Sequence, residues 1–234
     1  MAEMQDDAGN HGIKEDAESK LAKAIFSEIY AHGIWGKSEN HGGGRYYSGA
    51  GSHMPTFAEP YIRQVAQYLG TFPKKPDVAD LGCGDFAIGS QIRPYCGRYI
   101  AGDIVDDVIA YNRQRFTDLD VDFQVLNLAE SPLPGADIVF VRQVFQHLSN
   151  AMIQKSLDNI RRSYPILVLT EHVPGGNAFV PNMDMAINAD IRMVQGSGVV
   201  ITAPPFSVPV KSQTVICDVD LGTSRVVTTV YEFA

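Results

Sequence analysis

The sequence is poor in cysteine and has neither a strongly basic run nor a long apolar one. Its three cysteines, Cys83, Cys96 and Cys217, are too few and too scattered for a disulfide framework, and no C-x-x-C pair or Cys/His cluster suggests a zinc site. We therefore expect a reducing, cytoplasmic setting. No stretch of about eighteen apolar residues occurs, so no segment is predicted to span a membrane. The net charge of -8 argues against a protein that binds nucleic-acid phosphates and favours a small-molecule partner.

The composition predicts a single domain with added segments. Hydrophobic residues make up 45% of the 234, which is enough for one sizeable core. Residues 1–14 are polar and acidic, so we expect a disordered tail there and no signal or transit peptide. We expect N-terminal helices and a glycine-rich lid over residues 15–75, followed by an α/β core over residues 76–234.

Within the N-terminal part, two helices are predicted around a loop rich in glycine and aromatic residues. Leu21, Ile25 and Ile29 have helical spacing, which predicts an amphipathic helix over about residues 14–30. A second helix is expected from about Thr56 to Leu69. The loop between the two helices is the segment 32–53.

Short apolar runs alternate with helix-like segments after Pro76. Strands separated by helices imply parallel pairing through right-handed crossovers, and therefore a layered α/β sheet. Ser149 is a candidate N-cap for a helix that ends before Pro165. Two strand-like runs then close the chain as a predicted antiparallel hairpin. The predicted parallel strands are 78–81, 99–103, 121–126, 137–141 and 166–170, and the hairpin strands are 213–219 and 225–233.

The stretch VADLGCGDFAIG, residues 78–89, is built like a ligand-binding turn. A buried strand is expected to end at Asp80 and a helix to begin near Asp85, whose first N–H groups would be free. Gly82 and Gly84 allow a sharp turn and a close approach of the backbone to a ligand. A dinucleotide is one candidate ligand, because the glycines fit a loose G-x-G-x-x-A pattern and Asp103 lies about twenty residues further on. The carboxylate of Asp80 is unfavourable for a pyrophosphate and suits a ligand that carries positive charge.

Four motifs together resemble the class I S-adenosylmethionine-dependent methyltransferases. They are DLGCG from residue 80, AGDI from residue 101, NLA from residue 127 and DIVFVRQVFQHL from residue 137. The resemblance implies a Rossmann-like, mostly parallel sheet with helices on both faces, and S-adenosylmethionine as cofactor. Phe86 departs from the family pattern, which often has a third glycine at that position.

The resemblance also implies roles for single residues. Asp103 would hold the ribose hydroxyls through charge-assisted hydrogen bonds, and Asn127 and Leu128 would border the adenine. Arg142 and Gln143 would face the cofactor at the end of the fourth strand. The remaining cofactor residues implied at this edge are Asp80, Gly82, Cys83, Gly84 and Ile104.

The segment 32–53 resembles the N-terminal segment that folds over the cofactor in related small methyltransferases. Its donors could bind the methionine carboxylate; an ordinary mobile glycine loop is the alternative. We include Trp35, Ser48, Gly49, Gly51 and Ser52 in the cofactor site, and Tyr46 and Tyr47 among the substrate-binding residues.

Two histidines follow the ends of the fourth and fifth predicted strands, where parallel sheets present their active sites. Either His147 or His172 could accept a proton from a substrate hydroxyl, with Glu171 as the competing base. The alternative for each histidine is a polar residue that fixes a loop.

Residues 173–210 are too long for a plain connection, and we expect a substrate lid there. Asn182, Asp184 and Arg192 are its candidate substrate-binding residues, and a solvated excursion is the alternative. The Pro204–Pro205 pair predicts a rigid turn into the hairpin, which would place Phe206 at the pocket wall.

These features together predict a cytoplasmic methyltransferase that acts on a small hydroxyl- or amino-bearing metabolite, such as a sugar or a natural product. Two alternatives remain. One is a nicotinamide-dependent oxidoreductase; the other is a non-catalytic module that binds S-adenosylmethionine.

Overall fold

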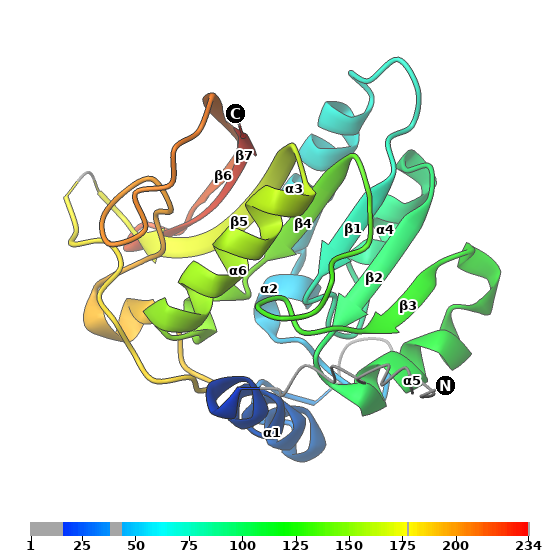
Figure 1. Ribbon diagram of the computed structural model, residues 1–234, viewed down its shortest axis with the longest axis horizontal. Helices are drawn as coiled ribbons and strands as arrows, with labels where there is room; N and C mark the ends of the chain where they lie inside the picture. Colours follow the sequence, from blue (N-terminus) through cyan, green and yellow to red (C-terminus); the bar gives the residue numbers. More distant parts are fainter. Residues whose placement is uncertain (1–15, 38–43, 177, 234) are drawn as a thin grey trace, which may run out of the picture.

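The computed structural model describes residues 16–37, 44–176 and 178–233, so the predicted tail over residues 1–14 lies outside it. A seven-stranded sheet with the order β3-β2-β1-β4-β5-β7-β6 forms the centre of the molecule (Figure 1). The strands are β1 (Val78–Leu81), β2 (Tyr99–Asp103), β3 (Asp122–Val125), β4 (Ile138–Arg142), β5 (Ile166–Pro174), β6 (Ser212–Asp220) and β7 (Ser224–Glu232).

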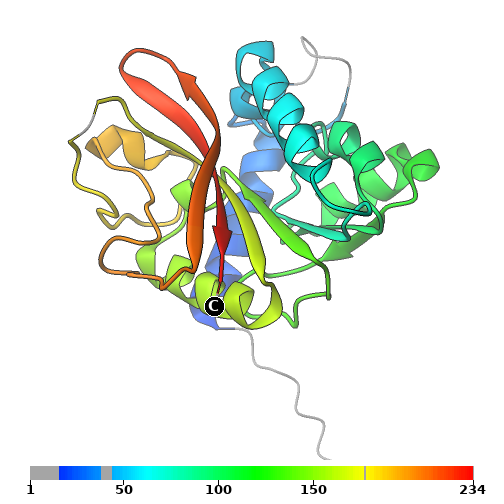
Figure 2. The ribbon, with the colours of Figure 1, turned by 90° about the horizontal axis from the view of Figure 1, so that it is seen from above.

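The first five strands are parallel, and the last two add an antiparallel hairpin. Figure 2 shows this hairpin, in orange and red, beside β5. The predicted fold class is therefore confirmed. β5 is longer than the predicted strand 166–170, because β7 pairs with it along its whole length from Ile166 to Pro174.

Helices cover both faces of the sheet. They are α1 (Ala17–His32), α2 (Ala50–His53), α3 (Pro55–Leu69), α4 (Gly89–Ile92), α5 (Asp106–Arg115) and α6 (Asn150–Ser163), with short 3₁₀ turns η2 (Arg93–Tyr95), η3 (Thr117–Leu119), η4 (Phe145–His147) and η5 (Arg192–Gln195). One apolar cluster joins α3, α4 and α5 to one face. A second cluster joins α1, α6 and parts of the segment 187–208 to the opposite face.

Local capping chemistry sets several helix ends. The Asp16 side chain accepts a hydrogen bond from the Glu18 amide at 2.6 Å and starts α1. Gly33, with a φ of 61°, ends that helix in the left-handed conformation that glycine adopts without strain. The predicted N-cap Ser149 accepts from the Met152 amide at 3.1 Å, as expected for α6.

The helix that we expected to begin near Asp85 does not form, and that prediction was wrong. α4 begins only at Gly89 and has four residues. Phe86 has a φ of 61°, a left-handed conformation that interrupts a helix, and its ring is fully buried beside Tyr99 and Phe123. The burial of this large ring compensates for the unfavourable backbone conformation.

Residues 178–210 are irregular but packed onto the core. Ile187, Ile201 and Phe206 are buried in the cluster that also holds α6. In the described part of the chain, no helix combines the length and the apolar character that crossing a membrane would require.

Candidate active site

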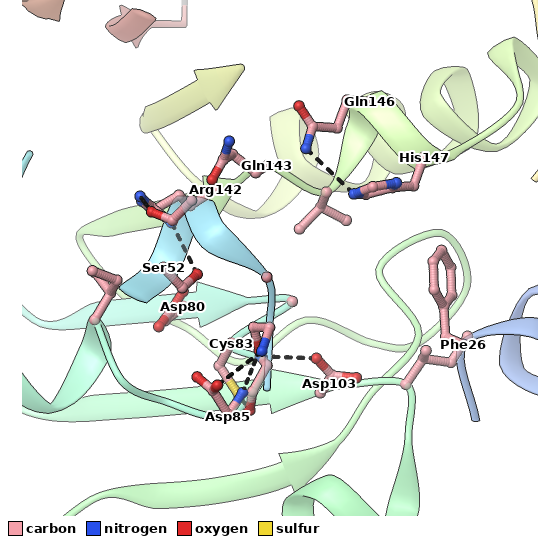
Figure 3. Close-up of a pocket in the computed structure, with 18 of the residues that line it drawn as sticks. Phe26, Ser52, Asp80, Cys83, Asp85, Asp103, Arg142, Gln143, Gln146 and His147 are labelled. Atoms are coloured by element: carbon pink, nitrogen blue, oxygen red, sulfur yellow. Dashed lines mark hydrogen bonds between the residues drawn. The ribbon is translucent and has the colours of Figure 1, made fainter. Parts of the chain in front are cut away.

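A cavity of about 290 Å³ lies at the carboxyl ends of the parallel strands, and α1 and α2 extend across this end of the sheet (Figures 1 and 3). Its wall contains every cofactor-binding residue predicted from the sequence. These are Trp35, Ser48, Gly49, Gly51, Ser52, Asp80, Gly82, Cys83, Gly84, Asp103, Ile104, Asn127, Leu128, Arg142 and Gln143. The structure thus brings together residues from β1, β2, β4 and the segment before α3.

The glycines of the loop make room for protein side chains. Gly82 and Gly84 have φ values of 83° and 53°, which glycine adopts most readily. A Cβ atom on Gly82 would lie 2.4 Å from Val144, and one on Gly84 would lie 2.3 Å from the Ser48 hydroxyl. Substitution at either position would therefore disturb the packing of the loop as well as its backbone.

The backbone amides of the loop are already satisfied within the protein. Gly84 donates to Asp103 Oδ2 at 3.0 Å, and Asp85 donates to Ser48 Oγ at 2.8 Å. The free N–H groups that a helix beginning near Asp85 would have supplied are therefore not present. A ligand must find its polar partners mainly among side chains and in the segment 48–52.

Asp103 and Asn127 fit the adenosine part of the cofactor. Asp103 is buried, and each carboxylate oxygen accepts one backbone amide, from Val105 or Gly84, which leaves further lone pairs for hydroxyl groups. Asn127 accepts from the Ala129 amide through Oδ1, whereas its buried Nδ2 has no hydrogen-bond partner among the described residues. Because an unpaired buried donor is unfavourable, this amide group is suited to an acceptor atom on a ligand.

The segment 44–53 is fastened to the glycine loop by Asp85, a residue that the sequence analysis did not single out. The buried Asp85 carboxylate accepts from the Ser48 amide at 2.9 Å and lies 2.5 Å from His53 Nε2. Tyr30 of α1 contacts the Ser48 hydroxyl at 3.0 Å. These contacts hold the segment over the cavity.

His147 is held as a neutral imidazole at one end of the cavity. Burial lowers its pKa to about 4, and its Nδ1 lies 2.9 Å from the Asp190 carbonyl, which can only accept a hydrogen bond. The proton is therefore on Nδ1, and Nε2 accepts from the Gln146 side-chain amide at 3.3 Å (Figure 3). Trp35 packs against the imidazole with ring centroids 4.9 Å apart.

His172 also lines the cavity, whereas Glu171 does not. Burial lowers the pKa of His172, and its Nε2 lies 2.9 Å from the Ser224 hydroxyl. Glu171 is buried, and neither of its oxygens meets hydrogen-bond geometry with a partner among the described residues. Burial raises the pKa of Glu171 to about 8, although the Arg192 charge opposes this.

The predicted substrate-binding residues lie outside the cavity wall: Tyr46, Tyr47, Asn182, Asp184, Arg192 and Phe206. The Asn182 amide donates to Val200 and Pro204 carbonyls at 2.9 Å, and the fully buried Arg192 donates to the carbonyls of Leu148 and Met183. Their polar groups therefore form hydrogen bonds to backbone carbonyls that stabilise the segment 178–210.

The other four have similar structural contacts. The carboxylate of Asp184 accepts the Asn150 and Met185 amides, and Phe206 belongs to the core. Tyr46 packs against Tyr30, and Tyr47 stacks on His53 at 4.3 Å.

Sequence reasoning missed several residues of the wall. Phe26 and Tyr30 of α1, Tyr61 of α3 and Gln146 all line the cavity. Phe26 and Tyr30 are four residues apart, so a helix places them on the same face. This spacing could have predicted that the two side chains lie together. Tyr61 and Gln146 carried no such signal.

Comparison with known proteins identifies the central part of the chain. A methyltransferase domain family matches residues 78–164. The match makes residues 78–164 a methyltransferase domain, and it covers less than half of the chain. The cofactor of this enzyme class is S-adenosylmethionine, and the match decides against the nicotinamide-dependent alternative and favours an enzyme over a non-catalytic module. No curated protein matches the methyltransferase significantly in sequence.

Solved structures show the same fold. Magnesium protoporphyrin IX methyltransferase from Synechocystis, with S-adenosylmethionine bound, is 16% identical with a TM-score of 0.57, and the alignment covers 93% of this chain and 98% of that one. The N-methyltransferase NodS from Bradyrhizobium japonicum, in complex with S-adenosylhomocysteine, is 13% identical with a TM-score of 0.56, covering 76% and 88%. Human N-acetylserotonin methyltransferase is 15% identical with a TM-score of 0.54, covering 76% and 52%.

Proposed function

We propose that this methyltransferase transfers the methyl group of S-adenosylmethionine to a hydroxyl or amino group of a small metabolite, with a sugar or natural-product scaffold as the expected class. The observation that carries the proposal is a group of uncharged, hydrogen-bonding side chains in the cavity wall. They are Gln143, Gln146, His147 and His172, and lowered pKa values keep both imidazoles neutral near pH 7. Such a wall suits a neutral polar acceptor better than a phosphate or a carboxylate.

The cofactor would supply a methyl group activated by its sulfonium, and Asp103, Asn127 and the segment 48–52 would hold it. The protein then has to align the acceptor with the methyl carbon, exclude water and remove a proton where the acceptor is a hydroxyl. His172 is better suited than His147 to accept that proton. The Nε2 atom of His147 is engaged by Gln146, and its pKa of about 4 makes it a weak base at neutral pH.

Three further predictions belong to this proposal. The domain division at about residues 75 and 76 remains a prediction. The role of residues 173–210 as a substrate lid also remains a prediction, supported by the position of Ala189 and Ile191 in the cavity wall. A cytoplasmic location also remains a prediction, supported by the three free thiols of Cys83, Cys96 and Cys217.

An acceptor screen that follows S-adenosylhomocysteine release tests the proposed function. Three sets of small acceptors should be compared: neutral alcohols and sugars, amines, and acids or phosphate esters. We expect turnover with members of the first two sets and none with the third. Methylation of acids alone would contradict the proposed acceptor class. Tight S-adenosylhomocysteine binding without turnover of any set would point to a non-catalytic module instead.

A further inference from the structure

Residues 188–192, called the strip below, belong to the irregular segment after β5 and contribute two side chains to the cavity wall. Hydrogen bonds connect the strip to two other parts of that wall. The indole Nε1 of Trp35 donates to the Ala189 carbonyl at 3.0 Å, and Nδ1 of His147 donates to the Asp190 carbonyl at 2.9 Å. The strip therefore lies where the N-terminal segment and η4 meet at the cavity.

Arg192 fixes the last residue of the strip. Its side chain is fully buried, although a guanidinium is always charged. Nη2 donates to the Leu148 carbonyl at 2.6 Å, and Nη1 donates to the Met183 carbonyl. Leu148 directly follows η4, which contains His147. One side chain thus connects the strip to η4 and to the earlier part of the irregular segment.

Glu171 of β5 lies near Arg192 but does not bind it. Neither Glu171 oxygen has a hydrogen-bond partner among the described residues. Burial raises the pKa of Glu171 to about 8, and the nearby Arg192 charge opposes this shift only in part, so the carboxyl is protonated near pH 7. The buried cation therefore depends on the two backbone carbonyls. Because hydrophobic residues often replace buried charges at little cost in stability, positioning explains this guanidinium better than stability does.

The strip borders the acceptor side of the proposed site. The cofactor is proposed to lie against residues that follow β1, β2 and β3, whereas His147 follows β4 and His172 belongs to β5. In the sheet, β4 and β5 lie on one side of β1, and β2 and β3 lie on the other. Since the strip is hydrogen-bonded to His147, its wall residues Ala189 and Ile191 lie on the β4 side.

We propose that Arg192 is a positioning residue for methyl transfer: it fixes the strip against η4 and thereby sets the shape of the acceptor side of the cavity. Ala189 and Ile191 then determine which acceptors fit beside the two histidines. Arg192 does not line the cavity and acts only through the strip. The inference rests on the proposed function for the role of this wall, but the position of the strip can be measured without an acceptor.

Fluorescence of Trp35, the single tryptophan of the chain, reports on the strip through its bond to Ala189. Arg192→Met removes the donors and keeps much of the side-chain volume. Trp35 emission should move to longer wavelength and acrylamide quenching should rise at least about twofold, because the indole loses its carbonyl partner and meets water. Arg192→Lys has a single amino group and should give intermediate values. Arg161→Met, at an exposed position of α6, is the matched control and should change neither value.

Hydrogen exchange and ligand measurements separate the acceptor side from the cofactor side. In Arg192→Met, amides of residues 186–192 should exchange at least about tenfold faster, since local opening becomes easier without the anchor. S-Adenosylhomocysteine affinity should stay within about threefold. The neutral alcohol or amine with the highest turnover in the acceptor screen should show a KM raised at least about fivefold, while the KM for S-adenosylmethionine stays within about threefold.

Three results would overturn the inference. Unchanged Trp35 emission and unchanged exchange of residues 186–192 in a folded Arg192→Met variant would mean that other bonds fix the strip. An equal loss of cofactor and acceptor binding would mean that Arg192 supports the whole cavity. If Arg192→Met does not fold, the same measurements apply to Arg192→Lys and to Arg192→Met combined with Glu171→Leu, which removes both buried polar groups. Unfolding of all three variants would make Arg192 a residue of general stability.

Failure of the proposed function would look different. An unchanged protein that binds no S-adenosylhomocysteine would contradict the proposed function. The emission of Trp35 and the exchange of residues 186–192 would still show whether Arg192 fixes the strip, because neither measurement requires a ligand.

Discussion

At the scale of single residues, the two histidines of the cavity differ in the hydrogen bonds that their rings make with the rest of the protein. His147 uses one ring nitrogen for the Asp190 carbonyl and the other for Gln146. The ring of His172 contacts the Ser224 hydroxyl on β7 through Nε2. A general base needs a free lone pair in reach of the acceptor and a pKa not far from the working pH, and His172 meets both conditions better.

His172→Ala should therefore lower turnover of a hydroxyl acceptor at least about tenfold while S-adenosylhomocysteine affinity changes by no more than about 0.5 kcal/mol. Burial lowers the pKa of His172, so the acidic limb of the rate profile should lie below the usual histidine value and disappear in the variant. Steady-state rates over a pH series measure both effects. Survival of the turnover and of the limb would make His172 a structural residue.

Glu171 does not line the cavity, so its substitution tests how burial raises the pKa of a carboxyl without changing the cavity wall. Its pKa is raised from the usual value to about 8, so between those values the folded protein holds a proton that the unfolded chain releases. The contribution of Glu171 to the free energy of unfolding is complete below the pKa that this carboxyl has in the unfolded chain. It is lost as the pH rises to about 8.

Glu171→Gln should remove this slope, which approaches about 1.4 kcal/mol per pH unit. Urea unfolding of both proteins at several pH values measures it, and the variant should gain stability relative to the unchanged protein as the pH rises. Glu59→Gln, on an exposed part of α3, is the matched control. Parallel pH curves for Glu171→Gln and the unchanged protein would show that the carboxyl is not held in its neutral form.

At the scale of elements, the sequence predicted the regular strands and helices better than the irregular segments. The alternation of apolar runs gave the parallel strands, and Ser149 marked the start of α6, because both signals are local. The missing helix near Asp85 depends on the burial of Phe86 among aromatic rings brought in by β2 and β3, which no local pattern contains. Asn182 and Arg192 could equally have served a substrate or the backbone, and only the fold distinguishes the two uses.

The segment 44–53 is fastened over the cavity by several contacts, and the Asp85 carboxylate takes part in two of them. Asp85→Asn weakens the acceptor for the Ser48 amide and for His53, so exchange of amides in residues 44–53 should become faster and S-adenosylhomocysteine affinity should fall by about 1–2 kcal/mol. Hydrogen exchange and calorimetry check the two effects, with Asp107→Asn on the exposed side of α5 as control. Unchanged exchange in residues 44–53 would mean that other contacts hold the segment.

At the scale of the whole molecule, one cavity is assembled from parts that are distant in sequence. α1 and the segment 48–52 come from the N-terminal part, the glycine loop and the strand ends from the matched domain, and Ala189 and Ile191 from the irregular segment beyond β5. The four motifs located one side of this cavity, the side proposed to hold the cofactor, because their residues lie at strand ends. The acceptor side could not be predicted in the same way, since its wall depends on how α1 and residues 186–192 pack.

The central claim is that this cavity binds S-adenosylmethionine with Asp103 as an anchor. Side-by-side calorimetric titrations with S-adenosylhomocysteine and a nicotinamide dinucleotide test it most directly, on the unchanged protein and on Asp103→Asn. We predict a dissociation constant of about 10 μM or lower for S-adenosylhomocysteine, no measurable binding of the dinucleotide, and a loss of about 1.5–3 kcal/mol in the variant. Dinucleotide binding, or S-adenosylhomocysteine affinity unchanged in Asp103→Asn, would contradict the account.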